Sequence, residues 1–339
     1  MQIVKTIDAV GHILCHDMTQ IIPGVKKDAP FRKGHIVTKQ DIPILLSMGK
    51  ENLYVWEKTV DMLHEDEAAE ILFQICKNEY MEGSEIKEGK IQLTATIDGL
   101  LKVNSDLLKK INSLGEIIIA TRHGNFPVKA GDKLAAARVI PLIIKEEKMN
   151  AAIELAKEET LLKLLPFQGK KAAIVVTGNE VYNGRIQDAF GPVIRKKLAE
   201  YQVEVISQEI VNDDTQKISE AILRAIDAGA DFITCTGGMS VDPDDTTPTA
   251  IKNTGAKLIT YGAPVLPGAM FLLAYYNENI PIMGLPGCVM YSKRTIFDLV
   301  LPRVIANDVM TVEDFAVLGE GGLCLECAEC SFPNCGFGK

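Results

Sequence analysis

Acidic and hydroxyl side chains are concentrated in one short stretch, 234-TCTGGMSVDPDDTTPTAI-251, which ends an apolar run on a Gly-Gly turn. Two adjacent glycines let the backbone approach a ligand closely, and the hydroxyl groups around them can donate hydrogen bonds to phosphate oxygens. Asp242, Asp244 and Asp245 are too many to cap one helix, and like charges packed this closely are costly unless a cation or a hydrogen-bonding ligand compensates them. The stretch therefore indicates a site for a charged ligand, and its carboxylates suit Mg²⁺.

Two other loops carry polar residues directly after apolar runs. In 177-TGNE-180, Gly178 permits a tight turn whose exposed N–H groups can meet a phosphate, although a plain loop with solvated side chains also explains the pattern. In 211-VNDD-214, Asp214 is explained as the cap of a following helix. Helix capping does not explain Asp213, which is therefore a candidate functional residue.

The elements that must position these loops follow from the periodicity of residues 172–306. Apolar runs at 172–177, 203–211, 230–236, 270–276 and 280–285 predict strands, and amphipathic stretches at 189–202, 215–230, 248–256 and 289–307 predict helices. Such alternation predicts an α/β fold with a mostly parallel sheet and helices on both faces. Ligands of these sheets bind beyond the carboxyl ends of the strands, which is where the polar loops and a further loop, 284-GLPG-287, leave the sheet.

The remaining chain predicts a smaller mixed α+β N-terminal region and a Cys-rich tail. In the upstream region we expect helices at 66–82 and 145–165 and strands within 88–103. We divide the chain into an N-terminal segment at 1–60, a small α+β module with its connecting helix at 61–165, the α/β domain at 166–310 and the tail at 311–339.

Composition limits the classes of function. The chain has 339 residues, 47% hydrophobic and 24% charged, which is typical of a soluble globular protein with more than one domain. No apolar run of about 18 residues and no secretion signal are present, so we expect a cytoplasmic protein without a membrane span. The net charge of −9 argues against nucleic-acid binding.

The polar loops together resemble the molybdopterin-binding domain, which is shared by molybdopterin adenylyltransferases, molybdopterin molybdotransferases and gephyrin. The resemblance covers about residues 170–306 and rests on the order and spacing of TGNE, VNDD, TGGMSVDPDDTT and GLPG. Residues 10–57 also resemble the molybdotransferase scaffold. The family implies molybdopterin as the ligand, with Mg²⁺ and molybdate as further components of the site.

The resemblance implies a role for each loop. The terminal phosphate of the pterin is expected in the turn of Thr236, Gly237, Gly238, Met239 and Ser240. Further cofactor contacts are expected at Thr177, Gly178, Asp242, Pro286 and Gly287. Glu180, Asp213 and Asp245 fall where the family carries acidic residues around the pterin, Mg²⁺ and molybdate, so they are the candidate catalytic residues, with Asp245 as the Mg²⁺ ligand.

Three departures from the family pattern favour binding over molybdenum insertion. Gly262 and Leu266 stand where molybdotransferases carry lysines that meet oxyanions. Cys288 replaces a polar amide in the loop after Gly287. Residues 60–165 do not match the insert that supplies partner acids to the active cleft in that family.

Half of the eight cysteines lie in the tail, 324-CLECAECSFPNCGFGK-339. Cys324, Cys327, Cys330 and Cys335 have the spacing C-x2-C-x2-C-x4-C, which suits tetrahedral Zn²⁺ or an iron–sulfur cluster. The C-x2-C-x2-C run resembles that of ferredoxins and slightly favours an iron–sulfur cluster over Zn²⁺. A redox-sensitive tail without metal is the alternative.

The sequence therefore predicts a protein that binds molybdopterin, or its adenylylated or molybdenum-loaded form, in molybdenum cofactor biosynthesis. If the chain is an enzyme, the resemblance implies a molybdopterin molybdotransferase. The alternatives are a non-catalytic carrier or sensor that delivers cofactor to a molybdoenzyme, and a nucleotide hydrolase of the competence-damage type. We expect a homo-oligomer whose partners are the pterin and a molybdoenzyme or cofactor-biosynthesis protein, with neither nucleic acid nor membrane involved.

Overall fold

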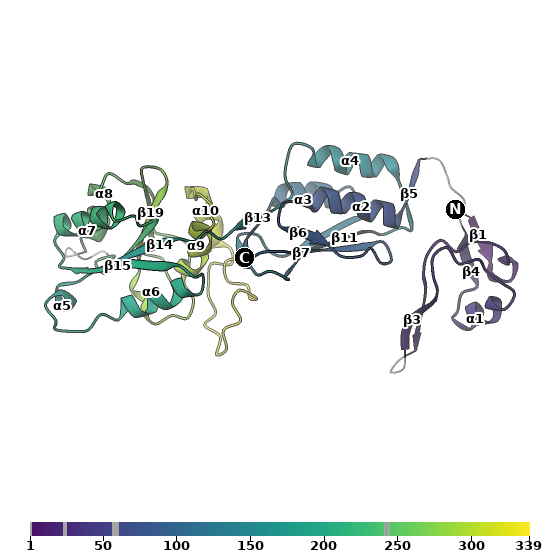
Figure 1. The fold of residues 1–339 in the computed structure, drawn as a ribbon, viewed down its shortest axis with the longest axis horizontal. Coiled ribbons are helices and arrows are strands. Elements are labelled where there is room, and N and C mark those ends of the chain that lie inside the picture. The colour runs from purple at the N-terminus through teal and green to yellow at the C-terminus, as the bar shows by residue number, and fades with distance from the viewer. Residues whose placement is uncertain (1, 23–25, 56–60, 241, 243–244) are drawn as a thin grey trace. The chain divides into compact units, whose positions relative to one another are not determined.

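The computed structural model describes residues 2–22, 26–55, 61–240, 242 and 245–339, and the chain forms two compact units (Figure 1). The first unit consists of Met1–Thr96, Val103–Arg122 and Gly131–Lys163. The second consists of Ile97–Lys102, His123–Ala130 and Leu164–Lys339. None of the helices in these described ranges is long and apolar enough to cross a membrane.

The first part of unit 1 is built from two antiparallel strand pairs. Strand β1 (Gln2–Lys5) pairs with β4 (Asn52–Val55), and β2 (Met18–Ile22) pairs with β3 (Lys26–Phe31). The 3-10 helix η1 (Thr6–Asp8) and helix α1 (Asp41–Ser47) complete this part. Its small core contains Leu14, Phe31, Leu45 and Leu53.

The second part of unit 1 is an antiparallel sheet with helices packed on it. The strand order is β6 (Met81–Gly83), β7 (Lys90–Ala95), β11 (Lys133–Val139) and β9 (Ile117–Thr121). Helix α2 (Glu65–Cys76) packs on β7 and β11, and α3 (Ser105–Asn112) and α4 (Glu146–Ala156) complete the helical layer. Strands β5 (Met62–His64) and β12 (Ile143–Lys145) pair separately.

Two helix predictions in this region are too long. The helix expected at 66–82 ends at Cys76, and the chain then enters β6. The helix expected at 145–165 ends at Ala156, because the chain turns into β13 (Leu162–Pro166), whose alternating buried residues pair in a three-stranded sheet of order β10 (Phe126–Val128), β8 (Gly99–Val103) and β13.

Unit 2 contains a six-stranded sheet that confirms the predicted fold class. The order is β15 (Glu204–Val211), β14 (Lys171–Thr177), β16 (Phe232–Thr236), β19 (Ile280–Leu285), β18 (Leu272–Tyr276) and β17 (Lys257–Tyr261). The first four strands are mutually parallel, and β18 and β17 are antiparallel additions at one edge.

Helices cover both faces of this sheet because the central strands are apolar on both sides. On β14, Ile174 packs in a core that includes helices α6 (Phe190–Ala199) and α9 (Ile296–Ile305). The neighbouring Val175 packs in a second core with α7 (Thr215–Asp227) and α8 (Thr247–Asn253). Figure 1 shows α7 and α8 on one side of the sheet and α6 on the other.

The helix predicted at 289–307 is shorter in the structure. The 3-10 helix η2 (Gly287–Met290) and a turn come first, and α9 begins after Thr295. Thr295 and Asp298 form a reciprocal capping box that satisfies N–H groups of the first turn, and this fixes where α9 starts. Helix α5 (Asn179–Tyr182), strand β17, helix α10 (Val312–Ala316) and 3-10 helix η3 (Val317–Gly319) were not predicted.

Candidate ligand-binding site

The polar loops of unit 2 leave the sheet at one edge. Because β14, β15, β16 and β19 are parallel, their carboxyl ends at Thr177, Val211, Thr236 and Leu285 lie at the same edge. The loops that carry the predicted site residues are thus brought together, as the α/β pattern predicts.

The Gly-Gly turn after β16 requires glycine at its first position. Gly237 has φ of 86° and Gly238 has φ of 53°, both in the left-handed region. A Cβ atom on Gly237 would lie 2.2 Å from the carbonyl oxygen of Thr177, so no side chain fits there. The turn therefore packs its backbone directly on the end of β14.

Threonine hydroxyls hold the underside of this turn. The Thr247 hydroxyl donates to the carbonyl oxygen of Gly237 at 2.8 Å, and its oxygen lies 3.2 Å from Oγ1 of Thr177. Thr236 is fully buried, and its Oγ1 has no hydrogen-bond partner among the residues that the structure describes. A buried hydroxyl without a partner costs free energy, and Thr236 lies outside the lining of the ligand cavity described below.

A cavity of about 430 Å³ opens at this turn. Of the residues predicted to contact ligand, those lining it are Gly237, Gly238, Met239, Ser240, Asp245, Pro286 and Gly287. Phe190, Ala269, Met270, Leu285, Cys288 and Tyr291 complete the lining. The predicted residues Thr177, Gly178, Glu180, Asp213, Thr236 and Asp242 belong to the surrounding loops and are not part of this lining. Asp244 lies outside the described residues.

The two described aspartates of the long loop support each other. The backbone N–H of Asp242 donates to Oδ2 of Asp245 at 2.9 Å, and the N–H of Asp245 donates to the carbonyl oxygen of Asp242. This turn holds the carboxylate of Asp245 at the cavity. Only Asp245 of the three candidate catalytic acids lines it.

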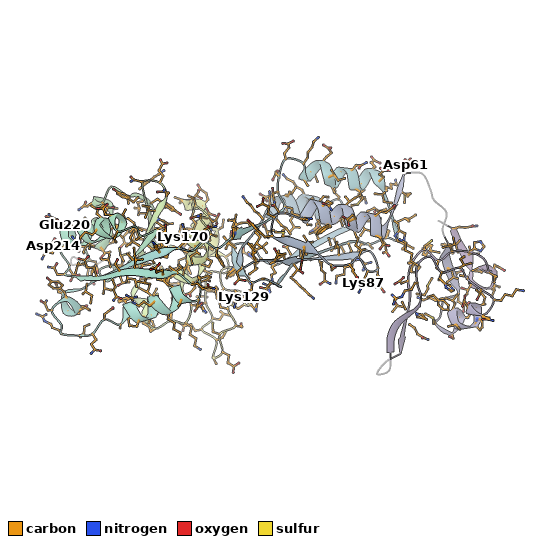
Figure 2. All side chains as sticks on the ribbon, in the orientation of Figure 1. Asp61, Lys87, Lys129, Lys170, Asp214 and Glu220 are labelled. Carbon is orange, nitrogen blue, oxygen red and sulfur yellow. The ribbon has the colours of Figure 1, made fainter. Side chains whose placement is uncertain are left out.

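The other acids have contacts within the carboxyl edge. Asp213 accepts a hydrogen bond from the N–H of Asn179 at 2.8 Å, which ties the loop after β15 to the start of α5. A Cβ atom on Gly178 would lie 3.0 Å from Oε1 of Glu180, so this carboxylate folds back over Gly178. Asp214 caps α7, as expected, by accepting from the N–H groups at the second and third positions of the helix, and Figure 2 shows it at the start of α7.

Tyr261 is a residue of the site that the sequence analysis missed. Its hydroxyl lies 3.2 Å from the carbonyl oxygen of Met239 and 3.0 Å from that of Ser240. Burial and the charge of Asp245 raise the pKa of Tyr261, so the phenol keeps the proton that it donates to these carbonyls. The stretch 257–261 forms β17, an edge strand paired with β18, and it carries no alternating pattern that would have indicated this role.

Cys288 brings a thiol into the cavity where the family pattern has an amide. The side chain is partly buried, and burial raises the pKa of the thiol. Cys288 is therefore a neutral thiol near neutral pH, with weak hydrogen-bonding capacity.

A dedicated protein cage for a metal is not present in the described part of the chain. No group of three or more His, Cys, Asp or Glu side chains there could hold a metal ion. Mg²⁺ does not need such a cage, because it is commonly held by one or two carboxylates together with the phosphates of its substrate and water. The carboxylate of Asp245 at the cavity fits that mode of binding.

Comparison with known proteins identifies the α/β part of the chain. Residues 173–306 match a family described as "probable molybdopterin binding domain". This segment is a molybdopterin-binding family domain. The match begins within β14 and ends just after α9, so it contains every residue that lines the cavity. Residues 3–57 match a second family, described as "domain of unknown function (DUF8806)".

Individual relatives share only parts of the chain. A CinA-like protein from Mycobacterium avium (strain 104) is 42% identical over 77 residues, which are 23% of this chain and 18% of the relative. A CinA-like protein from Mycobacterium sp. (strain MCS) is 43% identical over 91 residues, which are 26% and 21% of the two chains. The matched stretch thus spans about a fifth of the length of these relatives.

Solved structures are similar to the molybdopterin-binding domain at lower identity. The tungsten cofactor synthesizing protein MoaB from Pyrococcus furiosus is 22% identical, with 36% of this chain and 84% of that chain covered and a TM-score of 0.31. CinA from Thermoplasma acidophilum is 19% identical, with 40% and 99% covered and a TM-score of 0.34.

Proposed function

We propose that the chain binds molybdopterin, or its adenylylated or molybdenum-loaded form, with the terminal phosphate in the turn of residues 236–240. The observation that carries the proposal is the 430 Å³ cavity of a molybdopterin-binding family domain, backed by the Gly237–Gly238 turn. The proposed setting is molybdenum cofactor biosynthesis or delivery in the cytoplasm, by a homo-oligomer that passes the cofactor to a molybdoenzyme.

The backbone of the turn is preorganised for an anion. Tyr261 bonds the carbonyl oxygens of Met239 and Ser240. Because a trans peptide directs its N–H opposite to its carbonyl, the Tyr261 contact with Met239 also fixes the direction of the Ser240 N–H. Fixed backbone N–H groups and a hydroxyl at Ser240 are the donors that phosphate oxygens require.

Asp245 is the proposed ligand of Mg²⁺. It is the candidate acid at the cavity, and Asp242 holds its Oδ2 through a backbone N–H. When bound, the ion polarises a phosphate or molybdate oxygen. Asp213 and Glu180 are proposed as further acidic side chains around the pterin, Mg²⁺ and molybdate. They are the other candidate catalytic residues if the chain is a molybdopterin molybdotransferase.

Binding and delivery fit the site better than rapid molybdenum insertion. Gly262 and Leu266 offer no cation at the positions where the molybdotransferases carry lysines. Molybdate is a dianion, and its retention beside a phosphate calls for nearby positive charge. We therefore propose a carrier role ahead of a transferase role.

A second candidate function is hydrolysis of a nucleotide phosphoanhydride, which the resemblance to nucleotide hydrolases of the competence-damage type implies. The same cavity and the same Asp245-bound Mg²⁺ serve either ligand. Release of phosphate or a nucleoside monophosphate from a dinucleotide or nucleoside diphosphate tests this candidate directly, with Asp245→Asn as the inactive control.

Titration of the purified chain with molybdopterin in Mg²⁺ tests the main proposal. Asp245→Asn should weaken binding about ten- to a hundredfold, because it removes a charge-assisted contact of about 1.5–3 kcal/mol. Ser240→Ala should weaken it about two- to tenfold through loss of one neutral hydrogen bond. The matched control is Asp214→Asn, which removes a carboxylate from the same edge but keeps a good helix cap.

The control should bind with unchanged affinity. Equal affinities for the wild-type chain and Asp245→Asn, with Mg²⁺ present, would mean that Asp245 does not hold the ion. Absence of any molybdopterin binding to the wild-type chain would overturn the proposed function as a whole.

A further inference from the structure

The tail after η3 is an ordered loop that is closed on itself and fixed to unit 2. The N–H of Gly338 donates to the carbonyl oxygen of Gly321 at 2.9 Å, which joins the two ends of the loop. Leu266 exchanges hydrogen bonds with Gly322 and Cys324, each at 2.8 Å. Residues 321–339 are all described and contain no helix and no strand longer than a single bridge. A loop of this length without regular structure is unusual unless it has a function or a crosslink.

All four tail cysteines line one cavity of about 520 Å³. Cys324 and Cys335 are partly buried, and Cys327 and Cys330 are exposed. The four other cysteines of the chain lie outside this lining: Cys15, Cys76 and Cys235 are buried elsewhere, and Cys288 lines the ligand cavity. The fold thus gathers the sequence motif around one space rather than scattering it over the surface.

The lining of this cavity also contains two cations, Lys293 and Arg294. Lys293 Nζ donates to the carbonyl oxygen of Ala328 at 2.8 Å, and the Arg294 guanidinium lies 5.1 Å from the ring centroid of Phe332. Both contacts join these side chains to the tail. Four thiolates around a metal centre carry net negative charge, so cations at this wall are electrostatically favourable.

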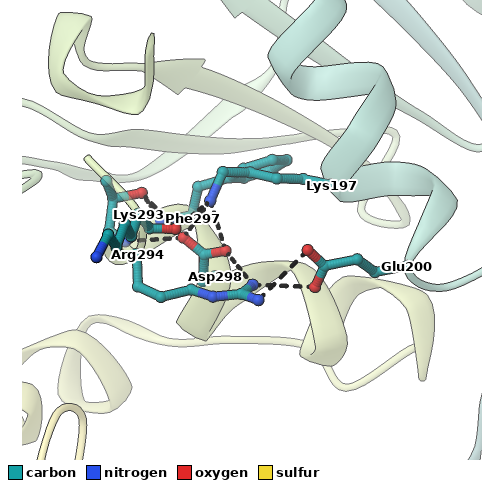
Figure 3. A network of polar contacts seen from close by, with 7 residues as sticks. Lys197, Glu200, Lys293, Arg294, Phe297 and Asp298 are labelled. Atoms are coloured by element: carbon teal, nitrogen blue, oxygen red, sulfur yellow. Dashed lines mark hydrogen bonds and ion pairs between the residues drawn. The ribbon is translucent and has the colours of Figure 1, made fainter. Parts of the chain in front are cut away.

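A buried ionic network holds these cations in place (Figure 3). Lys197 donates to both carboxylate oxygens of Asp298 and to the carbonyl oxygen of Lys293. Arg294 pairs with Asp298 at 2.9 Å and with Glu200 at 3.0 Å. Burial opposes the charge of Arg294, yet these two carboxylates raise its pKa, so the side chain stays a cation.

We propose that Cys324, Cys327, Cys330 and Cys335 hold an iron–sulfur cluster in this cavity. Nothing in the proposed pterin chemistry uses these residues, so the inference goes beyond the proposed function. The described residues hold no three metal-binding side chains within reach of one ion, so the exposed stretch 327–330 must close around the cluster when it binds.

The spacing of the cysteines, rather than the size of the cavity, favours a cluster over a single ion. Zn²⁺ and an iron–sulfur cluster can each be held by four thiolates, and the cavity of about 520 Å³ has room for either centre. A core of several iron and sulfide atoms needs room between the thiolates. The C-x2-C-x2-C run has the spacing of bacterial ferredoxins.

The proposed cluster would adjoin the pterin site. Tyr291 lines both the tail cavity and the ligand cavity. A cluster in the tail cavity and a pterin in the ligand cavity would therefore both lie next to Tyr291.

Anaerobic purification of the full chain, followed by iron, sulfide and zinc analysis, visible absorption and electron paramagnetic resonance, tests the proposal. The wild-type chain should contain about two to four iron atoms and an equal amount of sulfide, with the spectra of a cluster. Cys327→Ser combined with Cys330→Ser should reduce both at least tenfold. Cys288→Ser is the matched control, because it removes a thiol outside the tail, and it should retain the cluster.

Alkylation of the wild-type chain gives an independent measurement that needs no variant. Mass spectrometry should find all four tail thiols protected from iodoacetamide in the iron-loaded protein and modified after chelation of the iron. About one zinc per chain without sulfide would overturn the cluster assignment. Reduced tail thiols with neither metal, or paired disulfides in anaerobically purified protein, would overturn a metal centre altogether.

Discussion

The side-chain oxygens of Thr177 and Thr247 lie 3.2 Å apart and join the end of β14 to the start of α8. Thr247 already donates its single proton to the carbonyl oxygen of Gly237, so Thr177 must be the donor between the two hydroxyls. This chain of two hydrogen bonds holds the Gly-Gly turn against the sheet. The shape of the proposed phosphate site thus depends on residues beneath its lining.

Thr247→Val should lower the free energy of unfolding by about 1–3 kcal/mol, because it removes the partner of the partly buried Gly237 carbonyl and of the buried Thr177 hydroxyl. Molybdopterin affinity should fall with it as the turn loosens. Chemical denaturation and ligand titration measure the two effects. Thr249→Val makes the same change at an exposed position of α8 and should alter neither quantity. Equal stability of the two variants would contradict the role given to Thr247.

Lys197→Met should lower the free energy of unfolding by about 3 kcal/mol, measured by denaturant titration. Lys197 and Asp298 are both buried, and their atoms lie 2.7 Å apart. Loss of the ammonium leaves the buried carboxylate of Asp298 with Arg294 as its remaining ionic partner among the described residues, beside the hydrogen bonds from Thr295. The exposed pair Arg224–Glu209 provides the control, and Arg224→Met should cost less than about 1 kcal/mol. A similar small effect for both would show that the buried network contributes little.

Cys288 should report pterin binding through its reactivity. Because burial raises the pKa of this thiol, alkylation should be slow at neutral pH and should accelerate as the pH rises into the range where the thiolate forms. Bound molybdopterin should protect Cys288, since the thiol lines the cavity. Site-specific mass spectrometry checks this, with the fully buried Cys76 as an unreactive reference. Alkylation at the same rate with saturating pterin would place the ligand elsewhere.

Molybdenum insertion should be slow or absent at micromolar molybdate, although pterin binding is retained. Each lysine absent at Gly262 and Leu266 removes a charge-assisted contact of about 1.5–3 kcal/mol, or roughly ten- to a hundredfold in molybdate occupancy. An assay of adenylylated molybdopterin with molybdate measures the rate. Gly262→Lys with Leu266→Lys should increase insertion at low molybdate. A wild-type rate equal to that of a lysine-bearing molybdotransferase would contradict this prediction.

The α/β domain was predictable because its strands are buried on both faces and so appear as continuous apolar runs. Residues 172–177 form β14 as expected, and Asp214 is the helix cap that its position indicated. The parallel order then brings the loops after the strands to one edge, which is why seven predicted ligand residues line the cavity.

Other features depend on contacts that local sequence does not contain. Strand β17 is an edge strand that exists by pairing with β18, and Tyr261 reaches the site only through that pairing. The start of α9 is set by the capping box at Thr295 rather than by the apolar pattern upstream. Of the three candidate acids only Asp245 lines the cavity, because the position of each acid depends on how its loop folds after the strand.

The most direct test of the account compares the affinity of the wild-type chain for molybdopterin and for the same pterin without its terminal phosphate. Calorimetric titration should show molybdopterin bound and the phosphate-free form bound about ten- to a hundredfold more weakly, since the turn of residues 236–240 holds the phosphate. Equal affinities for the two pterins, or binding of neither, would contradict the proposal that this turn is a phosphate site for molybdopterin.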